Sequence, residues 1–165
     1  MNLTYNHEEV SKNGQYRIGV GAVIEKNGLI FCAHRLDAKE LQAVNFLQLP
    51  QGGVDKNEEI GAAIFREIFE ETGIDSKLLQ FVARAQNWTY YDVPTNFGEK
   101  IGGKKGQAHI WFHFRFIGED SDVNLNAFEP EFSAFFWKPA AEIVENSIHF
   151  KKEVHRLIFR EFGLV

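Results

Sequence analysis

The sequence is poor in cysteine, in proline and in long hydrophobic runs: it has one cysteine, Cys32, and four prolines. One cysteine excludes an internal disulfide and cannot by itself build a structural zinc site. This cysteine usage favours a reducing compartment, so we expect a cytoplasmic protein. No segment approaches the roughly 18 consecutive apolar residues of a membrane helix, and residues 1–16 lack the apolar stretch of a signal peptide. We therefore expect neither export nor a membrane partner.

An excess of positive charge is also missing. The 18 Lys and Arg residues stand against 23 Asp and Glu residues, which gives a net charge of −5. The whole molecule therefore repels polyanions, so duplex DNA is not an expected partner, and a phosphate-bearing ligand needs a local basic patch or a metal. The length of 165 residues and 44% hydrophobic content fit one domain with a sizeable core. We expect a single domain over residues 1–165, with 1–14 as a flexible extension; no oligomeric state is indicated.

Local patterns predict strands that interleave with two helices. Asn27-Gly28 between two β-type segments predicts a hairpin, and Gly73 predicts the end of a helix over 59–72, with Asp55 or Asn57 as its cap. Apolar residues at helical spacing predict a closing helix, at Phe150, Val154, Leu157, Ile158 and Phe162. The predicted strands are 16–24, 29–33, 46–49, 79–88, 109–116 and 135–137, with a mobile glycine-rich loop over 93–106. We expect an α/β (α+β) sandwich with a mixed sheet.

The helix over 59–72 has an unusual distribution of charge. Glu67, Glu70, Glu71 and Arg66 share one sector, and apolar side chains fill most of the remaining circumference. Like charges four residues apart cost about 0.2–0.5 kcal/mol, and the carboxylates lie in the half of the helix where the macrodipole disfavours anions. Mg²⁺ or Mn²⁺ would reverse this repulsion, since both prefer oxygen ligands. The sequence thus suggests a metal site for phosphate chemistry; a solvated acidic face is the alternative.

These residues also form a recognisable motif. The spacing Gly52-x5-Glu58-x7-Arg66-Glu67-Ile68-x-Glu70-Glu71-x-Gly73-Ile74 resembles the complete signature of the Nudix hydrolases. The resemblance implies an α/β/α sandwich, a divalent metal, and hydrolysis of a nucleoside diphosphate linked to another group. Further segments are similar to the branch of bacterial RNA pyrophosphohydrolases and dinucleoside polyphosphate hydrolases: Tyr16-Arg17, LPQGGV, Tyr90-Tyr91-Asp92, Gly106-Gln107, Pro130-Glu131-Phe132 and FKKEVHR.

The resemblance assigns roles residue by residue. It implies metal ligands at Glu67, Glu70, Glu71 and the Gly52 carbonyl, and an additional metal-associated or water-activating carboxylate at Glu131. Arg66 and Glu58 would form an ion pair that orients the catalytic helix. The implied contacts to substrate phosphates are Arg17, Arg35 and Lys151, and Tyr91 would stack on a base. The expected cofactor is Mg²⁺, with Mn²⁺ as a substitute.

Two departures from the branch concern the substrate. The branch usually has GQKQKWF where this chain has GQAHIWF, so Ala108 and Ile110 replace two lysines, for which Lys104 and Lys105 could substitute. Leu47 replaces an aromatic residue before the LPQGG segment. The implied activity is cleavage of a phosphoanhydride in dinucleoside polyphosphates, such as diadenosine tetraphosphate, or at the 5′-triphosphate end of RNA. The alternatives are a hydrolase of nucleoside diphosphate sugars such as ADP-ribose and a non-catalytic nucleotide sensor.

The strand over 109–116 leaves one further alternative open. His109 and His113 are about 13 Å apart along a strand, which is too far to share one metal ion. His109, Trp111, His113 and Arg115 would share one strand face, either facing a ligand or packed under another segment. An aromatic surface over 88–91 could likewise stack on bases or belong to the core.

Overall fold

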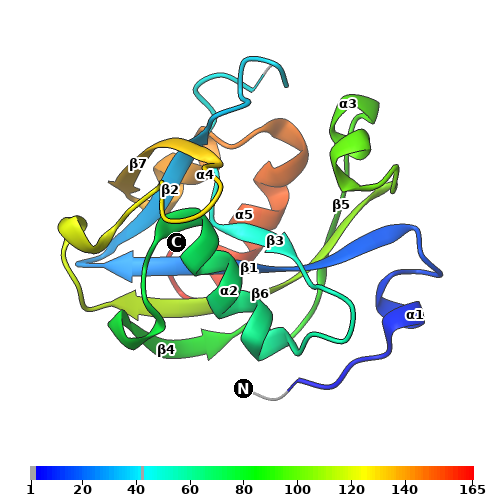
Figure 1. The fold of residues 1–165 in the computed structure, drawn as a ribbon, viewed down its shortest axis with the longest axis horizontal. Helices are drawn as coiled ribbons and strands as arrows, with labels where there is room; N and C mark the ends of the chain where they lie inside the picture. The colour runs from blue at the N-terminus through cyan, green and yellow to red at the C-terminus, as the bar shows by residue number, and fades with distance from the viewer. Residues whose placement is uncertain (1–2, 42) are drawn as a thin grey trace.

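One mixed sheet of seven strands forms the centre of the computed structural model, which describes residues 3–41 and 43–165 (Figure 1). The strand order is β4-β6-β1-β2-β7, while β3 pairs with β1 and β5 pairs with β6. β1 and β6 run parallel, and the other pairs are antiparallel, as expected for a mixed sheet. The strands are β1 (Tyr16–Lys26), β2 (Leu29–Arg35), β3 (Gln51–Gly53), β4 (Leu79–Arg84), β5 (Thr89–Asp92), β6 (Gly106–Phe116) and β7 (Phe132–Lys138).

Helices cover both faces of this sheet (Figure 1). Phe65 of α2 packs on Phe114 of β6 with ring centroids 5.4 Å apart, and His155 of α5 packs on Trp111 of the same strand at 6.0 Å. Because Trp111 and Phe114 point to opposite faces of β6, α2 and α5 lie on opposite sides. The α/β/α sandwich is confirmed. The helices are α1 (His7–Val10), α2 (Ile60–Thr72), α3 (Thr95–Gly98), α4 (Ala140–Glu145), α5 (His149–Glu161) and the 3₁₀ turns η1 (Ser76–Leu78), η2 (Glu99–Ile101) and η3 (Asp120–Asp122).

The predicted hairpin and helix end are both present. Asn27 and Gly28 have φ values of 53° and 79°, the left-handed pair that a tight turn between β1 and β2 requires. Gly73 ends α2 with φ 73°, and its N–H donates to the Phe69 carbonyl. The helix begins after Glu59, which makes no side-chain capping bond, so the prediction of Asp55 or Asn57 as the cap was wrong.

Close packing of β1 against β6 depends on glycine. A Cβ atom at Gly21 would lie 2.4 Å from the indole ring of Trp111, and one at Gly19 would lie 2.5 Å from the Gly52 carbonyl oxygen. Because glycine has no Cβ atom, β1 can pass close to the Trp111 ring at Gly21 and close to β3 at Gly19. These two glycines therefore set the distance between the strands that carry the site.

Several sequence expectations need correction. Residues 46–49 form no strand; Gln48 makes an isolated bridge to Ala33, and the paired strand is β3. The expected strand 79–88 ends at Arg84, because β4 and β5 pair with different halves of β6. The loop 93–106 contains α3 and η2, and α4, which begins after Pro139, was not predicted. In α5, Leu157 is exposed rather than buried.

The second face of β6 is packed rather than open to a ligand. His109, Trp111 and His113 are buried beneath α5, and only Arg115 of the four is exposed. Trp111 Nε1 donates to Thr89 Oγ1, and His113 Nε2 lies 2.8 Å from a Glu25 carboxylate oxygen. This resolves the open alternative in favour of packing.

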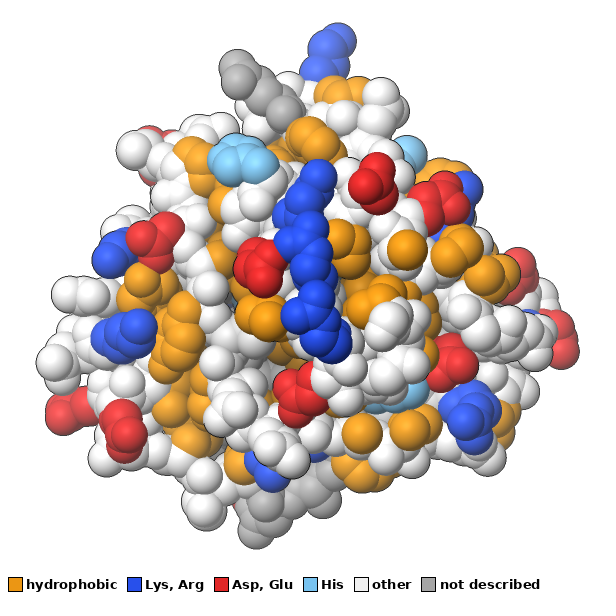
Figure 2. All heavy atoms as spheres, turned by 180° about the vertical axis from the view of Figure 1, so that it is seen from behind, with side chains coloured by type: hydrophobic (Ala, Val, Ile, Leu, Met, Phe, Trp, Pro, Cys, Tyr) orange, Lys and Arg blue, Asp and Glu red, His pale blue; other side chains and the backbone are white. Residues whose placement is uncertain are grey.

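Residues 3–14, within the expected flexible extension, contact the sheet in this structure. Val10 of α1 is buried beside Tyr16, and its carbonyl accepts a hydrogen bond from the Tyr90 hydroxyl. Figure 2 shows the face opposite to that in Figure 1, where basic, acidic and apolar side chains are interspersed apart from a central line of Lys and Arg. Among the described residues, no helix combines the length and apolarity needed to span a bilayer.

Replacing Gly21 with Ala should lower the free energy of unfolding by about 1–3 kcal/mol, because the added methyl group meets the Trp111 ring in a packed interior. Urea denaturation followed by tryptophan fluorescence measures this change. Gln80→Ala on the exposed side of β4 is the control, with an expected change within about 0.5 kcal/mol. Equal stability of the two variants would contradict the close approach of β1 and β6.

Candidate active site

A cavity of about 550 Å³ lies between the end of α2, the start of α5 and the loops around β3 and β7. It brings together ten of the eleven residues expected at the site, from seven segments far apart in sequence. Those ten are Arg17, Arg35, Gly52, Arg66, Glu67, Glu70, Glu71, Tyr91, Glu131 and Lys151. The eleventh, Glu58, reaches the site through Arg66. The cavity therefore contains both the acidic helix face and the basic residues that could meet a phosphate chain.

α2 presents its carboxylates to β3 at very short range. A Cβ atom at Gly52 would lie 2.0 Å from the Glu67 carboxylate, so any side chain at that position would displace this carboxylate. Glu71 is 1% exposed, and one of its oxygens accepts a 2.7 Å hydrogen bond from the Gln51 backbone N–H. Burial raises the pKa of Glu71 well above its usual value, and the neighbouring Glu131 charge raises it further. Burial likewise raises the pKa of Glu67 to about 7.

Arg66 is the counter-charge to this acidic surface. Its Nε and Nη2 atoms donate to the two Glu58 carboxylate oxygens at 2.6 and 2.8 Å, and Nη2 also donates to the Gly53 carbonyl at 2.8 Å. Its Nη1 atom lies 2.8 Å from a Glu67 oxygen and 3.2 Å from a Glu70 oxygen. The ion pair with Glu58 thus has the geometry that the resemblance implied, and the same guanidinium also bridges two of the three helix carboxylates.

The carboxylates have the chemistry of a divalent-cation site. The negative charge of Glu131 raises the pKa of both Glu67 and Glu71, and the Glu67 charge raises that of Glu71, so positive charge among these carboxylates would relieve an existing cost. Hard oxygen donors of this kind suit Mg²⁺ or Mn²⁺. Within residues 3–41 and 43–165, no three acidic, His or Cys side chains are grouped as metal ligands, because Arg66 lies between Glu67 and Glu70. The donor set fits a cation once these side chains turn toward it.

Basic side chains from other elements line the same cavity. Arg35, at the end of β2, donates from Nε and Nη2 to the Asp37 carboxylate at 2.7 and 2.9 Å. This ion pair holds the pKa of Asp37 below its ordinary value. Lys151 is buried, and its Nζ atom donates to Gln48 Oε1 at 3.0 Å. Burial lowers the pKa of Lys151 to about 7, and the nearby Arg35 charge lowers it further, so an arriving anion would favour its charged form.

Arg17 differs from Arg35, Arg66 and Lys151 in being exposed. Its guanidinium lies over Gly53, where a Cβ atom would come within 2.3 Å of Nη2. In the described part of the chain it forms no ion pair or side-chain hydrogen bond. It is therefore the basic group at the cavity whose charge is least neutralised by the protein.

Tyr91 lines the cavity but cannot stack on a base in this conformation. It is 6% exposed, and its ring lies between His109 at 5.7 Å and Phe150 at 5.9 Å, centroid to centroid. Its hydroxyl accepts a 2.8 Å hydrogen bond from Gln51 Nε2. The expected stacking role is corrected for this conformation: the ring is buried and packs on Phe150 and His109.

The lysines expected to substitute for those lost from the branch motif lie elsewhere. Lys104 Nζ donates to the Gly14 carbonyl, and Lys105 pairs with Asp92 at 3.6 Å, so neither lines the cavity. Lys100 of η2 does line it and pairs with Asp37 at 3.3 Å. Sequence reasoning missed this lysine because the segment reads as a glycine-rich loop, and only its tertiary position brings it to the site.

Two glutamines and one carboxylate were also missed. Gln51 and Gln107 line the cavity with an Oε1 atom that has no hydrogen-bond partner in the described chain. Asp37 joins the Arg35 and Lys100 charges from the loop after β2. The sequence did place Gln51 directly before Gly52 and Gln107 directly after Gly106, both within segments similar to the branch. The only signal for Asp37 in the sequence was its position two residues after Arg35.

The fold and cavity place an acidic helix face against Gly52 of β3, with basic side chains lining the same cavity. The Nudix domain model matches residues 15–162, which is most of the chain. The chain therefore belongs to the Nudix family.

Similar proteins come from bacteria and from more distant sources. An RNA pyrophosphohydrolase of Roseobacter denitrificans is 40% identical over 150 residues, covering 89% of this chain and 91% of the relative. Another from Orientia tsutsugamushi is 35% identical over 155 residues, with 92% of each chain covered. Among solved structures, the Escherichia coli dihydroneopterin triphosphate pyrophosphohydrolase aligns with a TM-score of 0.67 at 18% identity, over 86% of this chain and 95% of the other. A Caenorhabditis elegans Ap4A hydrolase complex aligns with a TM-score of 0.64 at 16% identity, over 89% of this chain and 98% of the other.

In the absence of metal, the stability should depend on pH through Glu67. Its pKa is raised from 4.5 to about 7, mainly by burial, so the folded state keeps a proton that the unfolded state releases. The stabilisation is full below about pH 4.5 and is lost as the pH rises to about 7. In EDTA, the wild type should lose about 3 kcal/mol of unfolding free energy across that range relative to Glu67→Gln.

Urea denaturation in EDTA at several pH values between 4.5 and 8 measures the difference between the two proteins. Glu59→Gln, an exposed position at the start of the same helix, is the control and should follow the wild type. A parallel pH dependence of the wild type and Glu67→Gln would exclude a raised Glu67 pKa.

Proposed function

We propose that this Nudix hydrolase is a divalent-metal-dependent pyrophosphohydrolase that acts on the 5′-triphosphate end of RNA. The observation that carries the proposal is one cavity that holds the acidic face of α2 together with four basic side chains, Arg17, Arg35, Lys100 and Lys151. A phosphate chain needs both: a metal held by carboxylates and cations along its length. Relatives named RNA pyrophosphohydrolase match about nine-tenths of the chain at 35–40% identity, which supports RNA as the substrate.

Each residue has a proposed role in this reaction. Glu67, Glu70, Glu71 and the Gly52 carbonyl would hold Mg²⁺, with Mn²⁺ as a substitute, and Glu131 would hold it or accept a proton from the attacking water. When bound, the metal supplies positive charge and a water of lowered pKa. Arg66, held by Glu58, would keep the acidic helix face against β3. Arg17, Arg35, Lys100 and Lys151 would contact the phosphates and balance the charge that develops as the anhydride bond breaks.

Dinucleoside polyphosphates are the second candidate substrate. Two lysines of the branch motif are Ala108 and Ile110 here, both buried, and neither Lys104 nor Lys105 reaches the cavity. Fewer cations near the entrance favour a small substrate over a long polyanion. The net charge of −5 also confines nucleic-acid contact to the 5′ end, so duplex DNA is not a proposed partner. The lone buried Cys32 supports a cytoplasmic location.

The test is a side-by-side assay with Mg²⁺ on a short 5′-triphosphorylated RNA and on diadenosine tetraphosphate, with ADP-ribose as a third arm. We expect the higher kcat/KM for RNA. A hundredfold preference for the dinucleotide would select the second candidate, and turnover of ADP-ribose alone would overturn both.

Glu70→Gln should lower kcat/KM on the preferred substrate by about 10²- to 10⁴-fold, because it removes a carboxylate from the metal site while keeping the side-chain shape. Product release followed by chromatography measures the loss. Glu59→Gln on the same helix is the matched control and should keep wild-type activity. Full activity in Glu70→Gln would contradict the catalytic assignment.

Metal binding should also be measurable as stability. Mn²⁺ or Mg²⁺ at about 100 times its dissociation constant should add about 2.7 kcal/mol to the unfolding free energy of the wild type. Glu71→Gln should lose most of this gain, while Glu59→Gln should keep it. Thermal melting with and without metal measures the shift. A wild type that melts identically in both conditions would favour the alternative of a solvated acidic helix.

A further inference from the structure

The aromatic rings at the cavity differ sharply in how much of their surface is free. Four aromatic side chains line it: Tyr91, Phe97, Phe128 and Phe150. Tyr91 and Phe97 are buried, and Phe150 packs on both of them. Phe128 is 55% exposed and lies near no other aromatic ring in the described chain. It is therefore the cavity aromatic with a free ring face.

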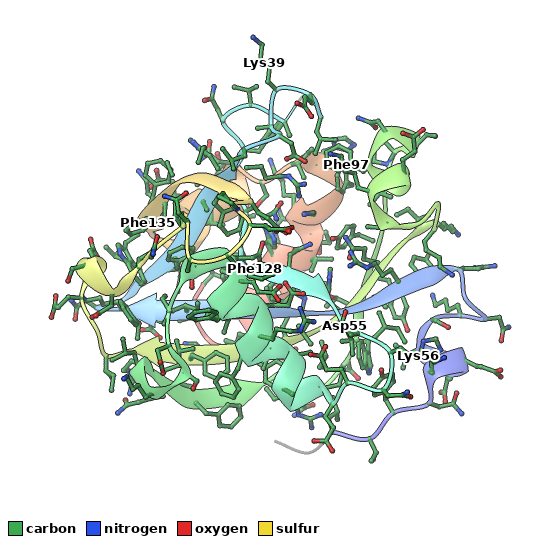
Figure 3. The ribbon with its side chains drawn as sticks, viewed as in Figure 1. Lys39, Asp55, Lys56, Phe97, Phe128 and Phe135 are labelled. Atoms are coloured by element: carbon green, nitrogen blue, oxygen red, sulfur yellow. The ribbon has the colours of Figure 1, made fainter. Side chains whose placement is uncertain are left out.

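Phe128 lies on the loop before β7, three residues ahead of Glu131, and lines the same cavity as the acidic residues of α2 (Figure 3). Leu36, which is 54% exposed, lines the same cavity directly after Arg35. The Leu36 backbone N–H donates to the Glu131 carbonyl at 2.9 Å, so the two segments are joined. The rim of the cavity thus carries two exposed apolar side chains next to a carboxylate and a cation.

One exposed apolar side chain needs no explanation, but two on the rim of a highly charged cavity indicate a ligand with a matching apolar part. Such a ligand must place anionic groups against Arg35 and Lys100 and a flat apolar group beside Leu36 and Phe128. A nucleotide has both parts, and its base would extend from the phosphates toward the rim.

We propose that Phe128 and Leu36 form a nucleobase-binding subsite, in which the base stacks on the Phe128 ring and contacts the Leu36 side chain. This inference rests on the proposed function, because the phosphates position the base. Stacking on an aromatic face contributes to binding of any base, so the subsite accepts different 5′ nucleotides.

The experiment compares two probes that differ in the base. Calorimetry with Mg²⁺ measures the affinity of the wild type and Phe128→Ala for AMP and for inorganic tripolyphosphate. We expect AMP affinity to fall about 5- to 150-fold in Phe128→Ala, while tripolyphosphate affinity stays the same. Leu36→Ala should give a smaller loss for AMP, and Phe128→Trp should retain AMP affinity.

Phe81→Ala is the matched control, since Phe81 is 51% exposed on β4 and does not line the cavity. It should bind both probes like the wild type. Equal AMP affinity in Phe128→Ala and Phe81→Ala would overturn the subsite, as would a parallel loss for tripolyphosphate.

The failure of the subsite and the failure of the proposed function give different results. If the wild type cleaves a polyphosphate substrate while Phe128→Ala keeps its AMP affinity, the subsite is wrong and the function remains. If the wild type cleaves no substrate but Phe128→Ala selectively loses AMP, the subsite is supported and the proposed reaction is wrong.

Discussion

The contacts of the Arg66 guanidinium determine how the acidic helix can exist next to β3. Its five N–H groups are directed at two Glu58 oxygens, the Gly53 carbonyl, Glu67 and Glu70. A planar, permanently charged group can satisfy this many acceptors at once, which a lysine cannot. Without it, Glu58, Glu67 and Glu70 would lose their shared counter-charge, and the Gly53 carbonyl would lose its donor. This one side chain therefore ties α2 to the Gly53 carbonyl of β3 and to Glu58 ahead of the helix.

Much of the fold was predictable because the signals were local. Asn27-Gly28 specified a turn, Gly73 specified a helix end, and the spacing of Glu67, Glu70 and Glu71 on one sector of α2 followed from helix geometry alone. The split between β4 and β5 was not predictable in this way. It arises because both strands pair along the same side of β6, and no property of residues 85–88 encodes how far along its partner a strand will pair.

The candidate site was predictable where a fixed motif carried it and unpredictable where tertiary packing decided. The acidic residues and Arg66 belong to one motif, so their proximity was implied by their spacing. Lys100 and Asp37 lie 63 residues apart and meet only because η2 packs near the loop after β2. Tyr91 illustrates the opposite error: the resemblance suggested stacking, but tertiary packing buries the ring against His109 and Phe150.

The Asp37 carboxylate competes with the phosphates of a substrate for two cations of the cavity, Arg35 and Lys100. Its carboxylate already occupies the Arg35 guanidinium and the Lys100 ammonium, in the way that a phosphate oxygen would. An arriving phosphate therefore exchanges with an anion instead of meeting bare positive charge, and the net gain in binding is smaller than two cations would suggest. The same exchange runs in reverse when the products leave, since Asp37 returns to its partners. A built-in anion of this kind limits how tightly the products are held, and so lets the enzyme release them after each turnover.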